Sequence, residues 1–190
     1  KLDADLAEAW YGKGLALARL REYNESIAAF DGAIKLHPKV ALSWYSKGLA
    51  LANLGRYNES MLALDKAVKL DGKLAGAWYS KALISAELGK NNESLAALKR
   101  TVELDIENED AWFNLGLAFT NMGKYSDALE AYNKVSDLNP INAPAFVKKG
   151  EALLALGRYS ESSEAFQRAS KIEPMDANAW YSNALALRLS

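Results

Sequence analysis

The stretch AEAWYGKGLAL at residues 7–17 returns along the chain at a fixed interval of 34 residues. The later copies are ALSWYSKGLAL (41–51), AGAWYSKALIS (75–85), EDAWFNLGLAF (109–119), APAFVKKGEAL (143–153) and ANAWYSNALAL (177–187). Each copy has an aromatic residue at its fourth position: Trp10, Trp44, Trp78, Trp112, Phe146 and Trp180. A constant period of this length is typical of a supersecondary unit that is repeated and stacked.

Each copy predicts the first helix of such a unit. The residue four positions after the aromatic one lies on the same helical face and is always small: Gly14, Gly48, Ala82, Gly116, Gly150 and Ala184. A small residue beside a large ring lets a neighbouring helix approach closely, while the ring fills the adjacent gap.

A second helix is predicted after each of the first five copies. Its small column is Ser26, Ser60, Ser94, Ala128 and Ser162, and its large column is Phe30, Leu64, Leu98, Tyr132 and Phe166. The two helices are separated by a corner that contains Gly55, Gly89, Gly123 or Gly157, which fit a left-handed C-cap, and Arg21 takes this place in the first unit. The second helix is expected to end near Pro38, Gly72, Ile106, Pro140 and Pro174.

These columns resemble the tetratricopeptide repeat family, whose pattern is Trp, Leu-Gly, Tyr, Ala, Phe and Pro at fixed offsets. The fourth unit matches best, through Trp112, Leu115, Gly116, Phe119, Ala128, Tyr132 and Pro140. The resemblance covers residues 7 to 190 and implies an all-α fold, a right-handed α-α superhelical solenoid of antiparallel helix pairs. Pentatricopeptide RNA readers are the nearest alternative, but their different period and their lack of this Trp column argue against them.

The repeat period also predicts the organisation of the chain. We expect residues 1–6 to be the tail of a preceding repeat and 177–190 to be the first helix of a sixth repeat or a terminal helix. Between them lie five full repeats, at residues 7–40, 41–74, 75–108, 109–142 and 143–176.

The triplet Asn-Glu-Ser recurs at Asn24, Asn58 and Asn92, and it fits the acceptor pattern for N-glycosylation. A sugar acceptor has no reason to keep a 34-residue period, whereas a structural unit does. Because Asn is a preferred N-cap, we interpret these residues as caps of the second helix.

Composition narrows the classes of function. The net charge is −1, from 23 basic and 24 acidic side chains, and cysteine is absent. We therefore expect neither nucleic-acid binding through a basic surface nor disulfides. No apolar run is long enough for a membrane span and no signal-peptide pattern opens the sequence, so we expect a chain without membrane association, located in the cytoplasm.

No residue pattern predicts catalysis. His37 is the only histidine and is expected to be an exposed turn residue, since no partner for catalysis or metal binding recurs beside it. An acidic cluster of Asp105, Glu107, Glu109 and Asp110 could hold a cation, but a solvated turn before a helix capped by Asn108 explains it as well. We expect no enzyme activity, no metal and no cofactor.

Function is therefore expected on the surface that stacking creates. In the resembled family the first helices line the concave side of the solenoid. The ligand-binding residues predicted there are Tyr11, Leu15, Tyr45, Leu49, Tyr79, Leu83, Phe113, Asn114 and Leu117. An alternative interpretation is that the aromatic members pack between adjacent first helices. The family's carboxylate clamp of Lys, Asn and Arg is absent, and Asn114 alone matches its Asn ladder for peptide backbones.

These features favour a non-catalytic scaffold for protein–protein interaction, which docks a partner peptide or helix in a concave groove, mainly through apolar side chains. The alternative is a substrate-recruiting or regulatory repeat array of a larger enzyme or signalling protein. Self-association through exposed terminal helices is a further expectation, because the ends of an open solenoid expose their stacking faces.

Overall fold

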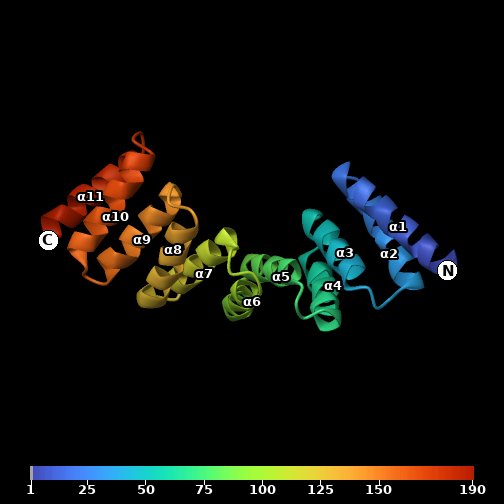
Figure 1. Ribbon diagram of the computed structural model, residues 1–190. Helices are drawn as coiled ribbons and strands as arrows, with labels where there is room; N and C mark the ends of the chain where they lie inside the picture. Colours follow the sequence, from blue (N-terminus) through green and yellow to red (C-terminus); the bar gives the residue numbers. More distant parts are fainter. Residues whose placement is uncertain (1) are drawn as a thin grey trace. The chain divides into compact units, whose positions relative to one another are not determined.

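The computed structural model describes residues 2–190, with side chains from residue 6 onward, and this part of the chain consists of helices joined by short turns, without a strand. Five pairs of helices and one further helix follow one another in the order expected from the repeats (Figure 1). Their bounds are α1 (Leu2–Arg19), α2 (Tyr23–Leu36), α3 (Ala41–Asn53), α4 (Tyr57–Leu70), α5 (Ala75–Glu87), α6 (Asn91–Leu104), α7 (Glu109–Asn121), α8 (Tyr125–Leu138), α9 (Ala143–Ala155), α10 (Tyr159–Ile172) and α11 (Ala177–Leu189).

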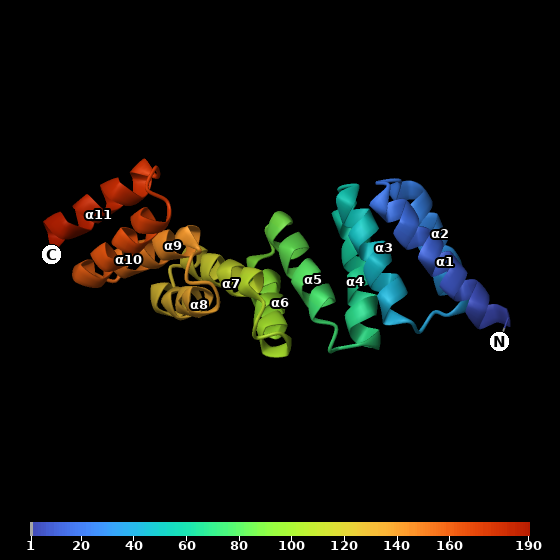
Figure 2. The same ribbon diagram turned by 45° about the horizontal axis from the view of Figure 1, so that its top comes forward.

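The helices form two compact units. Unit 1 extends to Leu104 and contains α1 to α6, and unit 2 runs from Asp105 to Ser190 and contains α7 to α11. Within each unit, every helix packs on the next one along the chain, as the turned view of Figure 2 shows for the pair α3 and α4. The predicted all-α fold of paired helices is confirmed. The first helix begins at Leu2, so it includes residues that we had assigned to the tail of a preceding repeat.

A left-handed residue makes each corner inside a pair. The predicted glycines have φ between +70° and +73°, and Arg21 has φ +63° at the equivalent place. Around Gly55, two backbone bonds close the end of α3: the N–H of Gly55 donates to the carbonyl of Ala52 (2.9 Å), and the N–H of Arg56 donates to that of Leu51 (3.0 Å). The chain therefore reverses within three residues, as the Gly pattern predicts.

The prediction that Asn24, Asn58 and Asn92 are N-caps is wrong. The second helices begin at Tyr23, Tyr57 and Asn91, so each Asn lies in the first turn of its helix rather than before it. The reason is the tightness of the corner, because a single residue separates the left-handed glycine from the next helix. In the second repeat that residue is Arg56, which makes no side-chain cap and instead forms a two-pronged ion pair with Glu59 (2.7 and 2.6 Å).

Inside each pair, the small residue of the first helix packs against the large residue of the second helix. A Cβ added to Gly48 would lie 2.9 Å from Cγ of Leu64, and one added to Gly116 would lie within 2.8 Å of the Tyr132 ring. The small residue therefore permits this close approach. Buried serines add polar links, because the hydroxyls of Ser26, Ser60 and Ser162 donate to the carbonyls of Gly14, Gly48 and Gly150 (2.8, 2.6 and 2.8 Å).

The Trp column lies at the edge of the core rather than inside it. Trp44, Trp78 and Trp112 are half-buried, and the indole Nε1–H of Trp44 donates to the carbonyl of Pro38 in the preceding turn (2.9 Å). Trp78 and Trp112 make the same bond to Gly72 and Ile106 (3.0 and 2.9 Å). The ring thus fixes the turn between repeats, which the spacing alone did not predict.

Candidate functional site

Two aromatic members of the predicted site in unit 1, Tyr11 and Tyr45, pack between repeats. The Tyr11 hydroxyl forms a hydrogen bond with the Ser46 hydroxyl on α3 (3.2 Å), and its ring centroid lies 5.7 Å from that of Phe30. Tyr45 reaches the start of α5, where a Cβ on Gly76 would come within 2.9 Å of its hydroxyl oxygen. Tyr79 is half-buried in the same column. The rings therefore set the spacing of adjacent first helices.

The leucine members are more accessible. Leu15 on α1 and Leu83 on α5 keep 37% and 40% of their residue surface exposed, and Leu49 on α3 is half-buried. Because these leucines occupy equivalent positions on the three first helices of unit 1, they form an apolar row on the same helical face as the rings. We call this row the leucine row.

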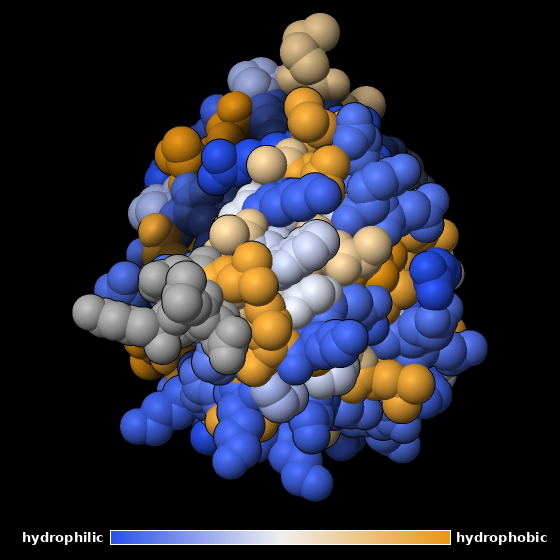
Figure 3. All heavy atoms as spheres, turned by 90° about the vertical axis from the view of Figure 1, so that its right-hand side faces the viewer, coloured by the Kyte–Doolittle hydropathy of each residue, from blue (hydrophilic) through white to orange (hydrophobic). Residues whose placement is uncertain are grey.

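A hollow of about 340 Å³ lies between the first two repeats and shares Tyr11 with this face. Its walls come from α1, α2, the following turn and the start of α3: Ala7, Glu8, Tyr11, Ala33, His37, Val40, Leu42 and Ser43. Val40 and Leu42 are exposed at its rim. The N-terminal end of the molecule in Figure 3 shows apolar side chains in patches among hydrophilic ones. The hollow is a place where a ligand could bury apolar atoms.

His37 is not the exposed turn residue that we expected. Its side chain is half-buried, and its Nε2 atom is buried without a hydrogen-bond partner. A buried imidazole nitrogen without a partner is costly unless another group supplies the hydrogen bond. The hollow therefore combines apolar walls with one unsatisfied polar atom.

The predicted site residues of unit 2 are all partly buried. Phe113 packs its ring 5.9 Å from that of Tyr132, Leu117 is half-buried, and the side-chain amide of Asn114 donates to the carbonyl of Asp110 (2.9 Å). In α11, by contrast, Trp180 and Tyr181 are exposed, and Trp180 keeps 52% of its surface in solvent. Self-association through this helix remains a prediction.

Residues of the acidic segment 105–110 form hydrogen bonds at the start of α7. Asn108 accepts a hydrogen bond from the N–H of Ala111 (2.9 Å), which confirms it as the N-cap. Glu109 accepts from the side-chain amides of Asn139 and Asn142 (3.0 and 2.5 Å). Among the described residues, no three potential metal ligands from His, Cys, Asp and Glu gather at one point.

Over the residues that the structure describes, no helix combines the length and the apolar character that a membrane span requires.

Sequence reasoning missed two features. The first is the hollow that contains His37, which no repeated residue pattern marks because His occurs once in the chain. The second feature is a pair of bridges, from Lys47 to Asp31 (2.5 Å) and from Lys81 to Asp65 (2.6 Å), which a search for repeated Asp and Lys 16 residues apart could have found.

Similar solved structures share this fold. A crystal structure of MamA superimposes with a TM-score of 0.82 at 24% sequence identity, over 92% of this chain and 95% of that one. YrrB, described as a TPR protein with an unusual peptide-binding site, gives 0.81 at 22% identity, over 92% and 90%. MamA from Desulfovibrio magneticus RS-1, from residue 41 to its end, gives 0.80 at 22% identity, over 91% and 98%.

Family models agree with the structural likeness. Models described as tetratricopeptide repeat match residues 2–39, 11–86 and 109–142, and a TPR repeat model matches 82–123 and 150–188. No curated protein matches the sequence. Since the matched segments cover most of the chain and the helix pairs follow the repeat throughout, the chain belongs to the tetratricopeptide repeat family.

Proposed function

We propose that this chain is a non-catalytic scaffold for protein–protein interaction, and that it binds the apolar face of a partner peptide or helix along the first helices of unit 1. The observation that carries the proposal is the hollow lined by Tyr11, whose walls are mainly apolar and which contains the unpartnered His37 Nε2. YrrB, which has the same fold, is described as having a peptide-binding site.

The leucine row supplies the apolar contacts. Leu15 and Leu83 are exposed enough to lose further surface to a ligand, and each Å² of apolar surface removed from water contributes about 25 cal/mol. An amphipathic helix presents apolar side chains at every third or fourth position, and such a stripe suits a row of leucines from successive parallel helices. A hydrogen-bonding group on the partner would satisfy Nε2 of His37.

The aromatic rings of this site have a structural role. Because Tyr11 and Tyr45 contact the next repeat, their rings hold the first helices at a fixed spacing and so keep the leucine row in register. We therefore assign contact with the partner to the leucines and the hollow, and positioning to the rings. In unit 2, Leu117 and Asn114 are proposed as partner contacts of that unit by itself.

The test starts from amphipathic peptides selected for binding to the chain from a displayed random library. Affinity is then measured by fluorescence anisotropy for wild type, for the Leu15→Ala/Leu83→Ala variant, and for Leu62→Ala as a matched control. Leu62 lies on α4, a second helix, and is 72% exposed.

We expect the double variant to weaken binding at least ten-fold, since about 1.4 kcal/mol corresponds to a factor of ten. Leu62→Ala should change affinity less than two-fold, on the order of 0.4 kcal/mol. Circular dichroism shows whether both variants keep their helical content. Equal affinities of the double variant and wild type, with the fold intact, would place the binding surface elsewhere.

A further inference from the structure

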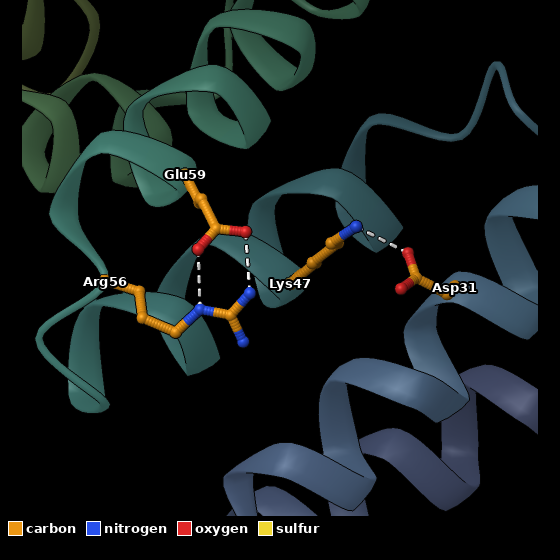
Figure 4. Close-up of polar contacts among 4 residues, drawn as sticks. All are labelled: Asp31, Lys47, Arg56 and Glu59. Atoms are coloured by element: carbon orange, nitrogen blue, oxygen red, sulfur yellow. Dashed lines mark hydrogen bonds and ion pairs between the residues drawn. The ribbon is translucent and has the colours of Figure 1, made fainter.

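The two bridges of unit 1 follow one rule. Lys47 on α3 pairs with Asp31 on α2, and Lys81 on α5 pairs with Asp65 on α4, so each lysine reaches back to the preceding second helix. Figure 4 shows the Lys47 ammonium pointing at the Asp31 carboxylate, beside the separate pair of Arg56 and Glu59. At this position the fold places a cation next to a helix-borne carboxylate.

In unit 2 the equivalent positions carry the lysine but not the carboxylate. Lys149 on α9 is equivalent to Lys47, and the residue 16 positions earlier is Asn133 on α8, a neutral amide. Lys149 forms no ion pair with the residues that the structure describes. Lys149 as a whole residue is half-buried, and an opposite charge within a few ångströms of its ammonium is favourable.

A hollow of about 320 Å³ lies where Lys149 and Asn133 meet α10. Its floor is apolar and buried, and consists of Leu129, Leu153 and Ala165, which form one core cluster. A ligand that fits this place would bring apolar atoms to the floor as well as a charge to the lysine. We call this place the Lys149 hollow.

The charges at the rim favour an anion. Arg168 lies with its guanidinium 5.9 Å from the Phe146 ring centroid and forms no ion pair among the described residues. Arg158 is already neutralised by a two-pronged bond to Glu161 (2.7 and 2.6 Å). Glu164 is exposed at the rim and opposes an anion. Three cations against two carboxylates leave one net positive charge around the hollow.

The Glu161 carboxylate is not available to replace the missing aspartate. Its hydrogen bonds from Arg158 lower its pKa below the ordinary value, and the charge of Lys149 adds to this effect. Glu161 therefore stays ionised and bound to Arg158, which leaves Lys149 and Arg168 as the two cations without a direct ion pair among the described residues.

We propose that the Lys149 hollow binds an acidic peptide segment of a partner protein, with an Asp or Glu carboxylate at Lys149 and Arg168 and a neighbouring apolar side chain on the Leu129–Leu153 floor. The occupant is inferred from unit 1, where the same position is filled by an Asp carried on a helix. The hollow lies wholly in unit 2, so this site does not depend on the leucine row of unit 1.

The test uses two capped tripeptides, acetyl-Leu-Asp-Leu-amide and acetyl-Leu-Asn-Leu-amide, titrated into the ¹⁵N-labelled full chain. We expect the Asp peptide to shift the amide signals around Phe146, Lys149 and Ala165, with at least five-fold higher affinity than the Asn peptide. The preference should shrink in high salt, because salt screens an exposed ion pair.

Two variants locate the site. Asn133→Asp supplies the internal carboxylate that unit 1 already has, so it should reduce affinity for the Asp peptide at least five-fold while the fold stays intact. Lys149→Gln should reduce the affinity to that of the Asn peptide. Equal affinities of the two peptides, no shifts at these residues up to millimolar concentration, or unchanged affinity in the Asn133→Asp variant would each overturn the proposal.

Discussion

The contact between Gly116 and Tyr132 offers the sharpest test of how the helix pairs pack. A Cβ added to Gly116 would lie 2.7 Å from Cδ1 of the Tyr132 ring and closer still to Cε1. The ring is fully buried, and its hydroxyl is hydrogen-bonded to Thr120 (3.1 Å), so it has little room to move. We expect Gly116→Ala to destabilise the chain.

The magnitude follows from two opposing effects. Overpacking a core by one carbon costs about 1 to 3 kcal/mol. Replacing Gly by Ala inside a helix returns about 1 kcal/mol of helix propensity. The net loss should therefore be about 0 to 2 kcal/mol, measured by urea unfolding followed by circular dichroism.

The third repeat supplies the control, because it has Ala82 and Leu98 at the equivalent positions. In a Tyr132→Leu background the same Gly116→Ala change should be neutral or stabilising by up to about 1 kcal/mol, since the propensity gain remains and the third repeat accommodates Ala with Leu at these positions. If Gly116→Ala stabilised the wild-type background as well, the close packing of this pair would be refuted.

Three further predictions concern single residues. Arg21→Gly should stabilise the chain by about 0.5 to 1 kcal/mol, because Arg21 has a left-handed backbone, whereas Gly55→Ala should destabilise it by a similar amount; urea midpoints that move the other way would contradict the strain argument. Burial raises the pKa of Tyr132, so the folded state holds the phenol proton more tightly than the unfolded state does. The stability that this proton contributes is complete below about pH 10, the pKa of an unfolded tyrosine, and is lost as the pH rises through the folded pKa. Wild type should therefore lose stability more steeply above that pH than Tyr132→Phe, and parallel curves would argue against the burial effect. Asp65→Asn removes the partially exposed bridge to Lys81 and should cost less than about 1 kcal/mol at low salt and less still in high salt, so a salt-independent loss would point to another cause.

The fold could be predicted in detail because the repeat makes each packing column visible. The small residue at Gly48 and the large one at Leu64 recur at fixed offsets, and the structure brings them into contact. The left-handed corner was predictable for the same reason, since Gly55 recurs and Arg21 occupies its place. A pattern repeated at one interval identifies the helices, their faces and their turns.

Features that depend on the reach of side chains were not predictable. The predicted Asn24 cap was wrong by two residues, since Glu22 is the N-cap and the corner is tighter than the sequence indicates. Likewise, the period gives the face on which Tyr11 and Leu15 lie, but it does not say that the ring is held against the next repeat while the leucine stays exposed. His37 occurs once, so no column could predict that its Nε2 is buried.

The proposed binding surface is tested most directly by methyl NMR of the full chain with a selected amphipathic peptide. Leucine methyl groups are labelled and assigned, and intermolecular nuclear Overhauser effects to the bound peptide are measured. We predict nuclear Overhauser effects between the peptide and the methyl groups of Leu15, Leu49 and Leu83. We also predict them for Leu42, at the rim of the hollow that contains His37. Effects confined to leucines of the second helices, such as Leu62, would contradict the account.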